Sequence, residues 1–491
     1  MTNGCFILIQ ITSDASSSRN ISTFRRYLAQ ILAVFIKNIN LFIYGTTLGL
    51  PTILVPSLSG KDAIVLDEEG ISWIASIINL CVPLGCLMSG AFSRKFGRIR
   101  SLQIVSVPYF LAFLTFHFST EPWHIFFALC LVGTAGGLSE SPALSYAVEV
   151  SEPNLRGVLT STSTLFISLG ILFSFILGSF YSWRTVALII AVPPVASIFL
   201  LMVIPETPYW LISRNRLKKS QESLAWLRGW TNVENVDKEF MEIRKNVQNI
   251  PSNSLKSNLK MYFEGRFFKP YFLIILMFIF DHFGFTPISV YAVSLFDVFQ
   301  IPINSYYATI FIGLANLLGS VICMLVLRFT GKRLLIFACL LGICINFILV
   351  GIYSFKMGIE NLENGDIPGL TWTWVPLVCI MLLGFLSYMS TFSFPWILVG
   401  EIYYNEIRDV ATGISAASGY LVSFLANKTF ISLVNSIGLY GVFWFYGGVA
   451  IAGIITLYFL LPETEGKSLF DVAQHFNDGP KLNNKVLKSN R

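Results

Sequence analysis

The sequence predicts an all-α membrane protein with twelve transmembrane helices in two six-helix bundles and short cytoplasmic helices between them. Of its 491 residues, 54% are hydrophobic and only 13% are charged, about half the charge of an ordinary soluble domain. Long apolar runs recur along the whole chain, and one polar segment divides them into two sets of six. The composition therefore excludes a soluble enzyme, a fibrous protein and a disordered scaffold.

Twelve apolar runs are long enough to cross a bilayer core of about 30 Å, which requires roughly 20 residues per helix. They lie at 28–58, 71–92, 101–119, 124–150, 158–180, 184–204, 269–297, 304–327, 333–355, 372–402, 410–436 and 438–461. Between the sixth and the seventh, Val236, Phe240, Ile243 and Val247 recur at helical spacing among charges. This pattern predicts short surface helices.

The basic residues predict the orientation, because cytoplasmic connections carry the excess of Lys and Arg. With both termini in the cytosol, the inner connections hold most of the basic residues, and an outer one is acidic, with Asp62, Asp67, Glu68 and Glu69. The net charge of +6 then reflects topology and predicts no nucleic-acid partner. We expect a cytosolic tail, a bundle, a cytoplasmic loop, a second bundle and a second cytosolic tail at 1–27, 28–204, 205–268, 269–461 and 462–491.

Glycine-containing basic turns stand at matching places in the two halves. Residues 90–98 (GAFSRKFGR) follow the second span, and residues 327–333 (LRFTGKR) follow the eighth. Six spans, a basic loop and six more spans are typical of a transporter whose cavity lies between two bundles.

Five motifs in chain order resemble those of the sugar porter family of the major facilitator superfamily. They are residues 90–98, Tyr146 and Glu149 with Arg156-Gly157, residues 205–208 (PETP), Pro395-Trp396 with Glu401 and Arg408, and residues 462–466 (PETEG). Within the family, residues 45–49 (GTTLG) and 428–430 (KTF) are similar to the insect trehalose-transporter branch. The resemblance implies a plasma-membrane carrier that moves trehalose or a hexose down its gradient by alternating access, with no cofactor and no obligate protein partner.

The resemblance also implies a cytoplasmic gate. Its expected members are Glu149, Arg156, Glu401, Arg408, Lys95, Arg98, Lys332 and Arg333. We expect Arg156 to pair with Glu401, and Arg408 with Glu149, when the cavity faces outward. The chain departs from the family where Arg94 and Arg328 replace acids and where Leu129 replaces an arginine of span four.

The expected sugar site departs further from the family pattern. The amide-rich motif of span seven reads FDHFGFT at 280–286. Six residues remain as candidates for substrate binding: Trp396, Asn316, Asp281, Thr286, Thr164 and Tyr420. An ionised Asp281 can only accept hydrogen bonds, so it is suited to sugar hydroxyl donors. We expect Phe394-Pro395-Trp396 to break span ten beside the cavity.

Charged residues near mid-membrane are costly unless paired or hydrated. Glu140 in span four is therefore the candidate coupling residue, and Asp281 with His282 is a second candidate. Lys37 and Lys428 lie nearer the ends of their spans, and we expect both to extend to the membrane surface. The glycosylation pattern at Asn427 falls within span eleven and is not expected to be used.

Three alternatives to a facilitative carrier remain open at this stage. They are a proton-coupled symporter that uses Glu140 or Asp281, a receptor that keeps the fold without transport, and a membrane enzyme, for which the motifs supply no nucleophile, base and orienting acid. ATP-driven pumping is excluded because the sequence has no GxxxxGK[ST] loop. The eight cysteines have no CxxC spacing, so neither a metal site nor a disulfide framework is expected.

Overall fold

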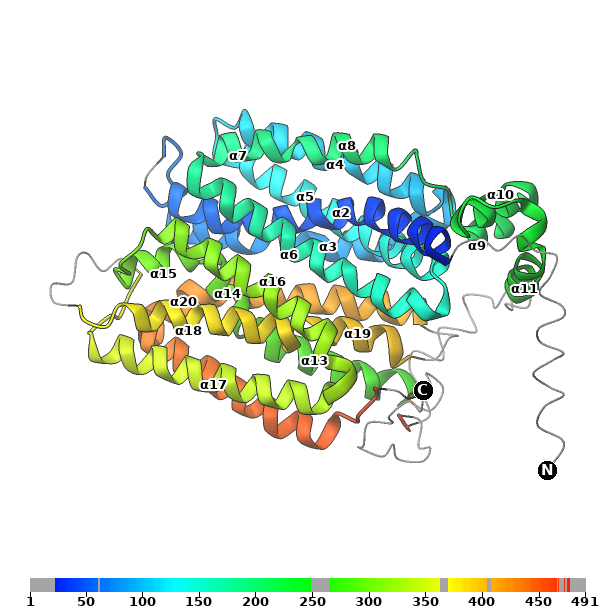
Figure 1. Cartoon of the computed structure of the whole chain (residues 1–491). Helices are drawn as coiled ribbons and strands as arrows, with labels where there is room; N and C mark the ends of the chain where they lie inside the picture. Colours follow the sequence, from blue (N-terminus) through cyan, green and yellow to red (C-terminus); the bar gives the residue numbers. More distant parts are fainter. Residues whose placement is uncertain are drawn as a thin grey trace, which may run out of the picture.

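The structure is a computed structural model that describes residues 23–60, 62–248, 265–362, 370–403 and 408–465, together with 467, 472, 475 and 476. Every regular element of these residues is a helix. Two groups of helices lie side by side with their axes roughly parallel, and a smaller helical cluster stands at one end (Figure 1). We call α2–α8 the first bundle and α13–α20 the second bundle.

The first bundle holds the first six predicted spans. Its helices are α2 Thr23–Leu58, α3 Glu68–Phe96, α4 Arg98–His117, α5 Pro122–Val150, α6 Pro153–Phe180, α7 Trp183–Ile190 and α8 Val192–Leu200. The sixth span is interrupted between α7 and α8 because Pro193 and Pro194 have no N–H to donate to the preceding turn.

In the second bundle two spans are interrupted, and two other spans are joined in one long helix. Its elements are α13 Gly265–His282, α14 Phe285–Val290, α15 Ala292–Val298, α16 Ser305–Thr330, α17 Lys332–Lys356, α18 Trp374–Leu386, η2 Ser387–Thr391, α19 Ser393–Glu401 and α20 Arg408–Leu460. The helix α20 is two spans joined at Gly438, whose backbone is not helical (φ 74°, ψ 161°).

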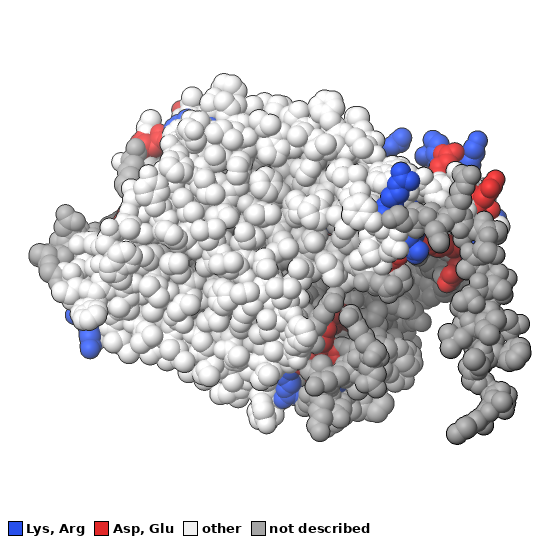
Figure 2. Space-filling model, viewed as in Figure 1, with Lys and Arg blue, Asp and Glu red and all other residues white. Residues whose placement is uncertain are grey.

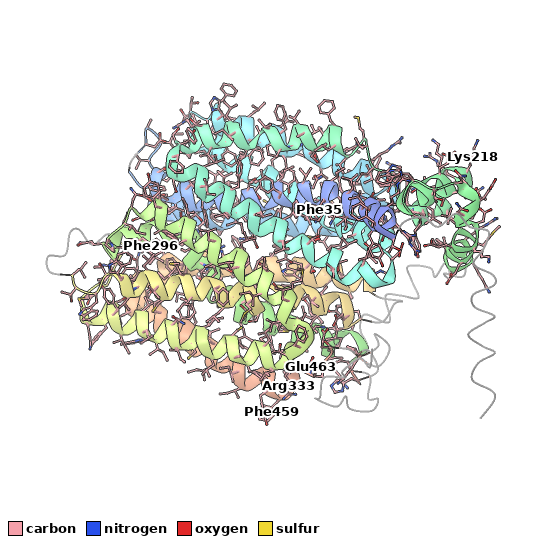
Figure 3. All side chains as sticks on the ribbon, in the orientation of Figure 1. Phe35, Lys218, Phe296, Arg333, Phe459 and Glu463 are labelled. Atoms are coloured by element: carbon pink, nitrogen blue, oxygen red, sulfur yellow. The ribbon has the colours of Figure 1, made fainter. Side chains whose placement is uncertain are left out.

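Eleven helical stretches of the described residues are long and apolar enough to cross a membrane. One of them, Ala411–Leu460, has 50 residues and would measure about 75 Å, more than twice the bilayer core. Counting it as two gives the twelve predicted spans. Figure 2 agrees, because a wide band without charged side chains separates charged groups at the two ends. Phe35 and Phe459, both labelled in Figure 3, are 44% and 79% exposed, as lipid-facing side chains would be.

The polar segment between the bundles forms the small cluster seen in Figure 1. It contains α9 Pro208–Ser213, α10 Leu217–Leu227, the short helix η1 Val233–Val236 and α11 Asp237–Gln248. Val236, Phe240 and Ile243 are buried against Ile212 and Leu224. The predicted amphipathic helices are therefore confirmed.

The two ends of the molecule differ in charge. We call the end with α9–α11 and the helix starts at Arg98 and Lys332 the basic end, and the end with Asp62, Glu68 and Glu69 the acidic end. At the acidic end Asp62 accepts hydrogen bonds from Arg184 Nη1 at 2.7 Å and Trp183 Nε1 at 2.5 Å. Burial opposes ionisation of Asp62, but these bonds outweigh it and lower its pKa below the usual value.

The break in span ten lies upstream of its predicted place. Residues 394–396 are helical, whereas η2 is a π-helical turn in which Phe392 N donates to Ser387 O at 2.9 Å. The ring of Pro395 would clash with the carbonyl of Thr391, four residues earlier, and cannot donate to it. The backbone adapts by widening the turn before the proline, as π-bulges commonly do at functional sites.

Close packing of α3 on α5 gives the first testable prediction. A Cβ atom on Gly85 would lie 2.2 Å from Thr134 O, whereas one on Gly90 of the same helix would meet nothing within 4 Å. Gly85→Ala must push the helices apart, at about 1–3 kcal/mol, and should lower the midpoint of heat-induced aggregation in detergent. Gly90→Ala is the matched control and should leave the midpoint unchanged or raise it. Equal midpoints for the two variants would contradict this packing.

Candidate functional site

Two glutamates, the half-buried Glu206 and the buried Glu463, cap corresponding helices at the basic end. The caps Gly97 and Gly331, with φ of 97° and 76°, have no side chain to accept from the first amides of α4 and α17. Glu206 accepts from Arg98 N and Ile99 N, both at 3.0 Å. Glu463 accepts from Lys332 N at 3.2 Å and Arg333 N at 3.0 Å, and Figure 3 shows Arg333 beside Glu463. In each bundle the glutamate thus links the segment after the sixth span to the start of the third span.

The ion pairs at the basic end stay within one bundle. Arg98 Nη2 lies 2.8 Å from Glu149 Oε1, joining α4 to α5. Lys332 Nζ lies 2.5 Å from Glu401 Oε2, joining α17 to α19. Among the described residues no hydrogen bond or ion pair crosses between the bundles at this end.

The expected gate residues are therefore arranged differently from the pairing predicted for the outward-facing state. Arg156 Nη2 points to Ser151 O at 3.5 Å and has no carboxylate partner in the described part of the chain. The side chains of Arg408 and Arg328 lie outside the described residues. Glu149 Oε2 is buried without a hydrogen-bond partner, so this acid is only half satisfied. The pairing of Arg156 with Glu401 and of Arg408 with Glu149 stays a prediction.

Two other expected gate residues, Arg333 and Lys95, contact groups of their own bundle. Arg333 donates to Leu461 O at 3.1 Å and Tyr458 O at 2.6 Å, which satisfies the last carbonyls of α20. Lys95 lies 5.2 Å from the ring of Phe96.

The acidic end is closed by contacts between the bundles. Lys428 Nζ on α20 donates to Glu69 Oε1 at 2.6 Å and Ser72 Oγ at 2.7 Å on α3, and it lies 4.3 Å over the ring of Trp73. Asn435 Nδ2 donates to Glu68 Oε2 at 2.8 Å. Lys428 thus reaches an exposed carboxylate of the opposite bundle, and the expectation that it extends to the membrane surface stays a prediction.

Two further contacts join other helices of the two bundles near the acidic end. Thr52 Oγ1 donates to Ser289 O at 3.0 Å, and Ser179 Oγ donates to Tyr306 O at 2.8 Å. The structure is thus closed at one end, and the described residues show no cross-bundle bond at the other.

Between the two ends a polar cluster spans the interface. Cys86 Sγ on α3 donates to Glu140 Oε2 on α5 at 2.9 Å. Tyr44 on α2 and Tyr420 on α20 lie close enough to interact with this carboxylate. The buried Tyr44 hydroxyl has no hydrogen-bond partner in the described part of the chain. Glu140 and Tyr420 are thus brought together from opposite bundles, while Tyr44 and Cys86 are additions that no sequence pattern indicated.

A row of aromatic rings extends from this cluster into the second bundle. Trp396 lies 5.4 Å from Tyr420 and 5.2 Å from Phe278, measured between ring centroids. Phe278 stacks in parallel on His282 at 5.7 Å. Aromatic faces of this kind suit the apolar face of a sugar ring. The sequence indicated Trp396 and Tyr420, whereas Phe278 was one of 43 phenylalanines with nothing to distinguish it.

Two buried asparagines have unpaired amide groups. Neither Nδ2 nor Oδ1 of Asn316 and Asn427 has a hydrogen-bond partner among the described residues, and their exposures are 0% and 1%. A buried unpaired amide costs several kcal/mol, so these groups are available to a polar ligand. Asn427 stands two helical turns after Tyr420. The sequence marked it only as a glycosylation pattern, and its burial agrees with the expectation that this pattern is unused.

Of the other three predicted substrate residues, Asp281 and Thr286 have side-chain partners within the protein, whereas Thr164 accepts a hydrogen bond through its backbone carbonyl. Asp281 is buried beside Thr391 of η2, and its Oδ2 lies 3.5 Å from His282 Nδ1. That nitrogen also lies 3.2 Å from Thr286 Oγ1. Thr164 O accepts from Ser168 Oγ, which in turn contacts Ser320 Oγ across the bundles at 3.1 Å.

Lys37 is fully buried, with 0% exposure, so the prediction that it extends to the membrane surface is wrong. Its Nζ donates to Ser163 Oγ at 3.3 Å between α2 and α6. No carboxylate pairs with it in the described part of the chain. Nor do the described residues contain any group of three metal-ligating side chains.

This fold, with a polar cluster drawn from both bundles, is that of a membrane transporter of the major facilitator type. The chain belongs to the family described as "Sugar (and other) transporter", whose model matches residues 26–476. The family is one of transporters, so the chain is not an enzyme.

Similar proteins agree with this family. The facilitated trehalose transporter Tret1 of Culex quinquefasciatus is 28% identical over 83% of this chain and 77% of its own length. Tret1 of Bombyx mori is 25% identical over 94% of this chain and 89% of its own.

Among solved structures, a partially occluded, inward-open xylose transporter XylE from E. coli has a TM-score of 0.72 and 20% identity, and covers 89% of this chain and 99% of its own. A sugar-bound form of the proton:xylose symporter XylE has a TM-score of 0.71 and 20% identity, and covers 91% and 99%. At this identity the likeness concerns the fold alone.

Asn316→Ala tests the unpaired amide. The substitution removes no internal hydrogen bond seen in the structure, so thermal stability should be unchanged or higher. If the amide binds substrate, the half-saturation concentration for sugar uptake should rise about tenfold. Asn346→Ala is the control, because Asn346 Nδ2 donates to Gly342 O at 2.8 Å; it should cost stability and leave half-saturation unchanged. The reverse pattern would assign Asn316 to structure.

Lys428→Gln tests the closure of the acidic end. Loss of an exposed ion pair and a cation–π contact should weaken the closed state. Hydrogen–deuterium exchange should then increase in peptides covering the first turn of α3 and residues 424–440. Lys356→Gln, which removes an exposed charge at the same end, is the control. If both variants exchange like the unmodified protein, Lys428 does not hold this end closed.

Proposed function

We propose that this protein is a facilitative transporter that moves a small sugar, trehalose or a hexose, across the membrane by alternating access. This mechanism is supported by a difference in cross-bundle hydrogen bonds between the two ends of the molecule. Lys428, Thr52 and Ser179 bond across the bundles at the acidic end, whereas the pairs of Arg98 and Lys332 at the basic end stay within one bundle. This is the arrangement of a carrier whose cavity opens toward the basic end.

We assign the basic end and both chain termini to the cytosol, and the protein to the plasma membrane. The excess of basic residues at the helix starts and on α9–α11 supports this orientation. The two predicted bundles, 28–204 and 269–461, then move as units around the central cluster.

In the outward-facing state the cytoplasmic gate closes. Glu149 has one buried oxygen without a partner, and Arg156 has no carboxylate partner among the described residues. Both groups lie in the first bundle, which therefore offers one carboxylate oxygen and one guanidinium to the second bundle. Pairing of Arg156 with Glu401 and of Arg408 with Glu149 would stabilise closure at this end.

We place the substrate beside Trp396, Tyr420 and Asn316, with Asn427 as an additional hydrogen-bonding group. The aromatic faces would pack against the sugar ring, and the unpaired amides would bond its hydroxyls. Asp281, Thr286 and Thr164 are further candidates, although the side chains of Asp281 and Thr286 have partners within the protein. The Tret1 relatives support trehalose as the first sugar to test.

The polar cluster around Glu140 favours transport without proton coupling. A coupling acid usually gains and loses a cationic partner during the transport cycle. Glu140 accepts instead from the Cys86 thiol, and Lys37, the buried cation of the same bundle, donates to Ser163. No ion pair joins Lys37 to Glu140 among the described residues.

Uptake by the purified protein in liposomes tests this function. Labelled trehalose and glucose should enter in a saturable way until the inside and outside concentrations are equal, because no energy source drives a uniporter. An inward proton gradient should not change the final level, and Glu140→Gln should behave the same way.

Two outcomes would contradict the proposal. Accumulation above equilibrium that requires the proton gradient and is abolished by Glu140→Gln would establish a symporter with Glu140 as the coupling residue. Absence of uptake of every sugar by folded protein that still binds sugar would establish a receptor.

A further inference from the structure

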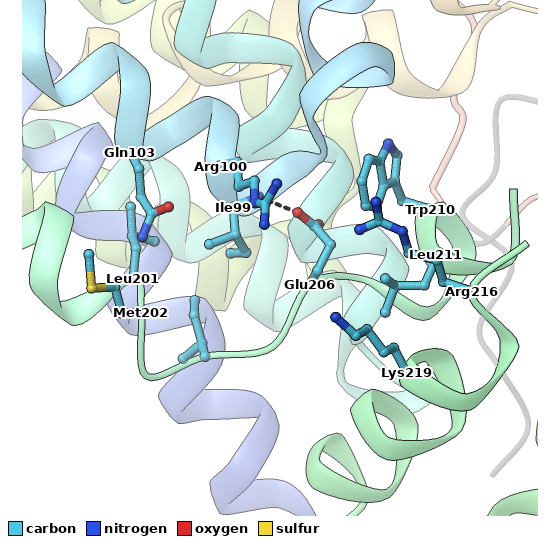
Figure 4. Close-up of a pocket in the computed structure, with 11 residues that line it drawn as sticks. Ile99, Arg100, Gln103, Leu201, Met202, Glu206, Trp210, Leu211, Arg216 and Lys219 are labelled. Atoms are coloured by element: carbon cyan, nitrogen blue, oxygen red, sulfur yellow. Dashed lines mark hydrogen bonds between the residues drawn. The ribbon is translucent and has the colours of Figure 1, made fainter. Parts of the chain in front are cut away.

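A cavity of 310 Å³ opens at the basic end, outside the central cluster (Figure 4). It lies between the start of α4, the end of α8 and the helices α9 and α10. One side is apolar, with Ile99, Leu201, Met202 and Ile204. The other side carries three basic residues, Arg100, Arg216 and Lys219.

The basic side of the cavity has uncompensated positive charge. Arg100, Arg216 and Lys219 are exposed, and none pairs with a carboxylate in the described part of the chain. Arg216 lies 5.8 Å over the ring of Trp210, which fixes its guanidinium at the rim. Guanidinium groups bind phosphate oxygens in bidentate fashion. These features favour a ligand with a phosphate group.

Glu206, the acid that lines the cavity, does not cancel this charge. Its carboxylate accepts from the backbone amides of Arg98, Ile99 and Thr207, each at 3.0 Å. Burial raises the pKa of Glu206, although these amide bonds oppose the rise. Its oxygens are therefore directed at the start of α4, and Figure 4 shows the hydrogen bond to Ile99.

The apolar side is continuous with the membrane-facing surface. Met202 and Val203 follow α8 directly and are 66% and 60% exposed. A free anion would use only the basic side and would leave this apolar wall in contact with water. A ligand with a phosphate at one end and a hydrocarbon chain at the other uses both sides.

We propose that this cavity binds an anionic phospholipid from the adjacent leaflet. The phosphate-bearing headgroup lies among Arg100, Arg216 and Lys219, and an acyl chain follows Leu201 and Met202 toward the bilayer. Each basic residue near an anionic headgroup contributes favourably, and the apolar wall adds buried hydrocarbon area. The bound lipid joins α4, α8 and α10 on the outer side of the first bundle.

The full-length protein in detergent is titrated with phosphatidylinositol 4-phosphate or with phosphatidylcholine of the same acyl chains. Native mass spectrometry then counts the bound lipids. The unmodified protein should bind one phosphoinositide much more tightly than phosphatidylcholine. The triple variant Arg100→Gln, Arg216→Gln, Lys219→Gln should bind it at least about tenfold more weakly. The matched control is Lys218→Gln, Lys238→Gln, Lys245→Gln, which removes three exposed charges from α10 and α11 outside the cavity, and it should bind normally.

Competition separates a lipid from a free anion. Soluble inositol 1,4-bisphosphate and inorganic phosphate should displace the lipid only at much higher concentration. Equal competition would make a free phosphate compound the ligand and overturn the proposal, and so would equal weakening in the control triple variant. If the triple variant does not fold, the single variants Lys219→Gln and Met202→Asn serve instead. Each should weaken lipid binding about threefold, and unchanged binding in both would also overturn the proposal.

Discussion

The absence of water in the bilayer core is the constraint on which the rest of this structure depends. Every backbone amide and every buried polar side chain there must find its partner within the protein or in a ligand. The spans are helical for this reason, and the glycine-capped starts of α4 and α17 receive carboxylates from Glu206 and Glu463. Where the constraint is not met, as at Asn316 and Asn427, the unpaired groups indicate a place for a polar ligand.

The same constraint explains how two bundles can separate at one end and stay joined at the other. At the basic end the ion pairs lie within single bundles, Arg98 with Glu149 and Lys332 with Glu401. Separation of the bundles there leaves few buried charges unpaired. At the acidic end Lys428 depends on Glu69 and Ser72 of the other bundle. Opening that end must replace these bonds, either with water or with new pairs at the basic end.

Irregular backbone lies at the centre of the second bundle. The π-helical turn η2 and the interruption between α13 and α14 place irregular backbone beside Asp281, Phe278 and Trp396. Irregular backbone at membrane depth is tolerated where protein or a cavity surrounds it.

The sequence by itself determined the class of the protein, the twelve spans, the amphipathic helices between the bundles and the family. These properties follow from hydropathy, from the periodicity of residues such as Phe240 and Ile243, and from motifs read along the chain. The tertiary structure alone decided which groups meet. It paired Glu149 with Arg98, buried Lys37 against Ser163, brought Lys428 to Glu69 and set Tyr44 and Cys86 beside Glu140. Such partners come from helices far apart in the sequence, and helix rotation and the state of the two bundles select them, neither of which is encoded in a local pattern.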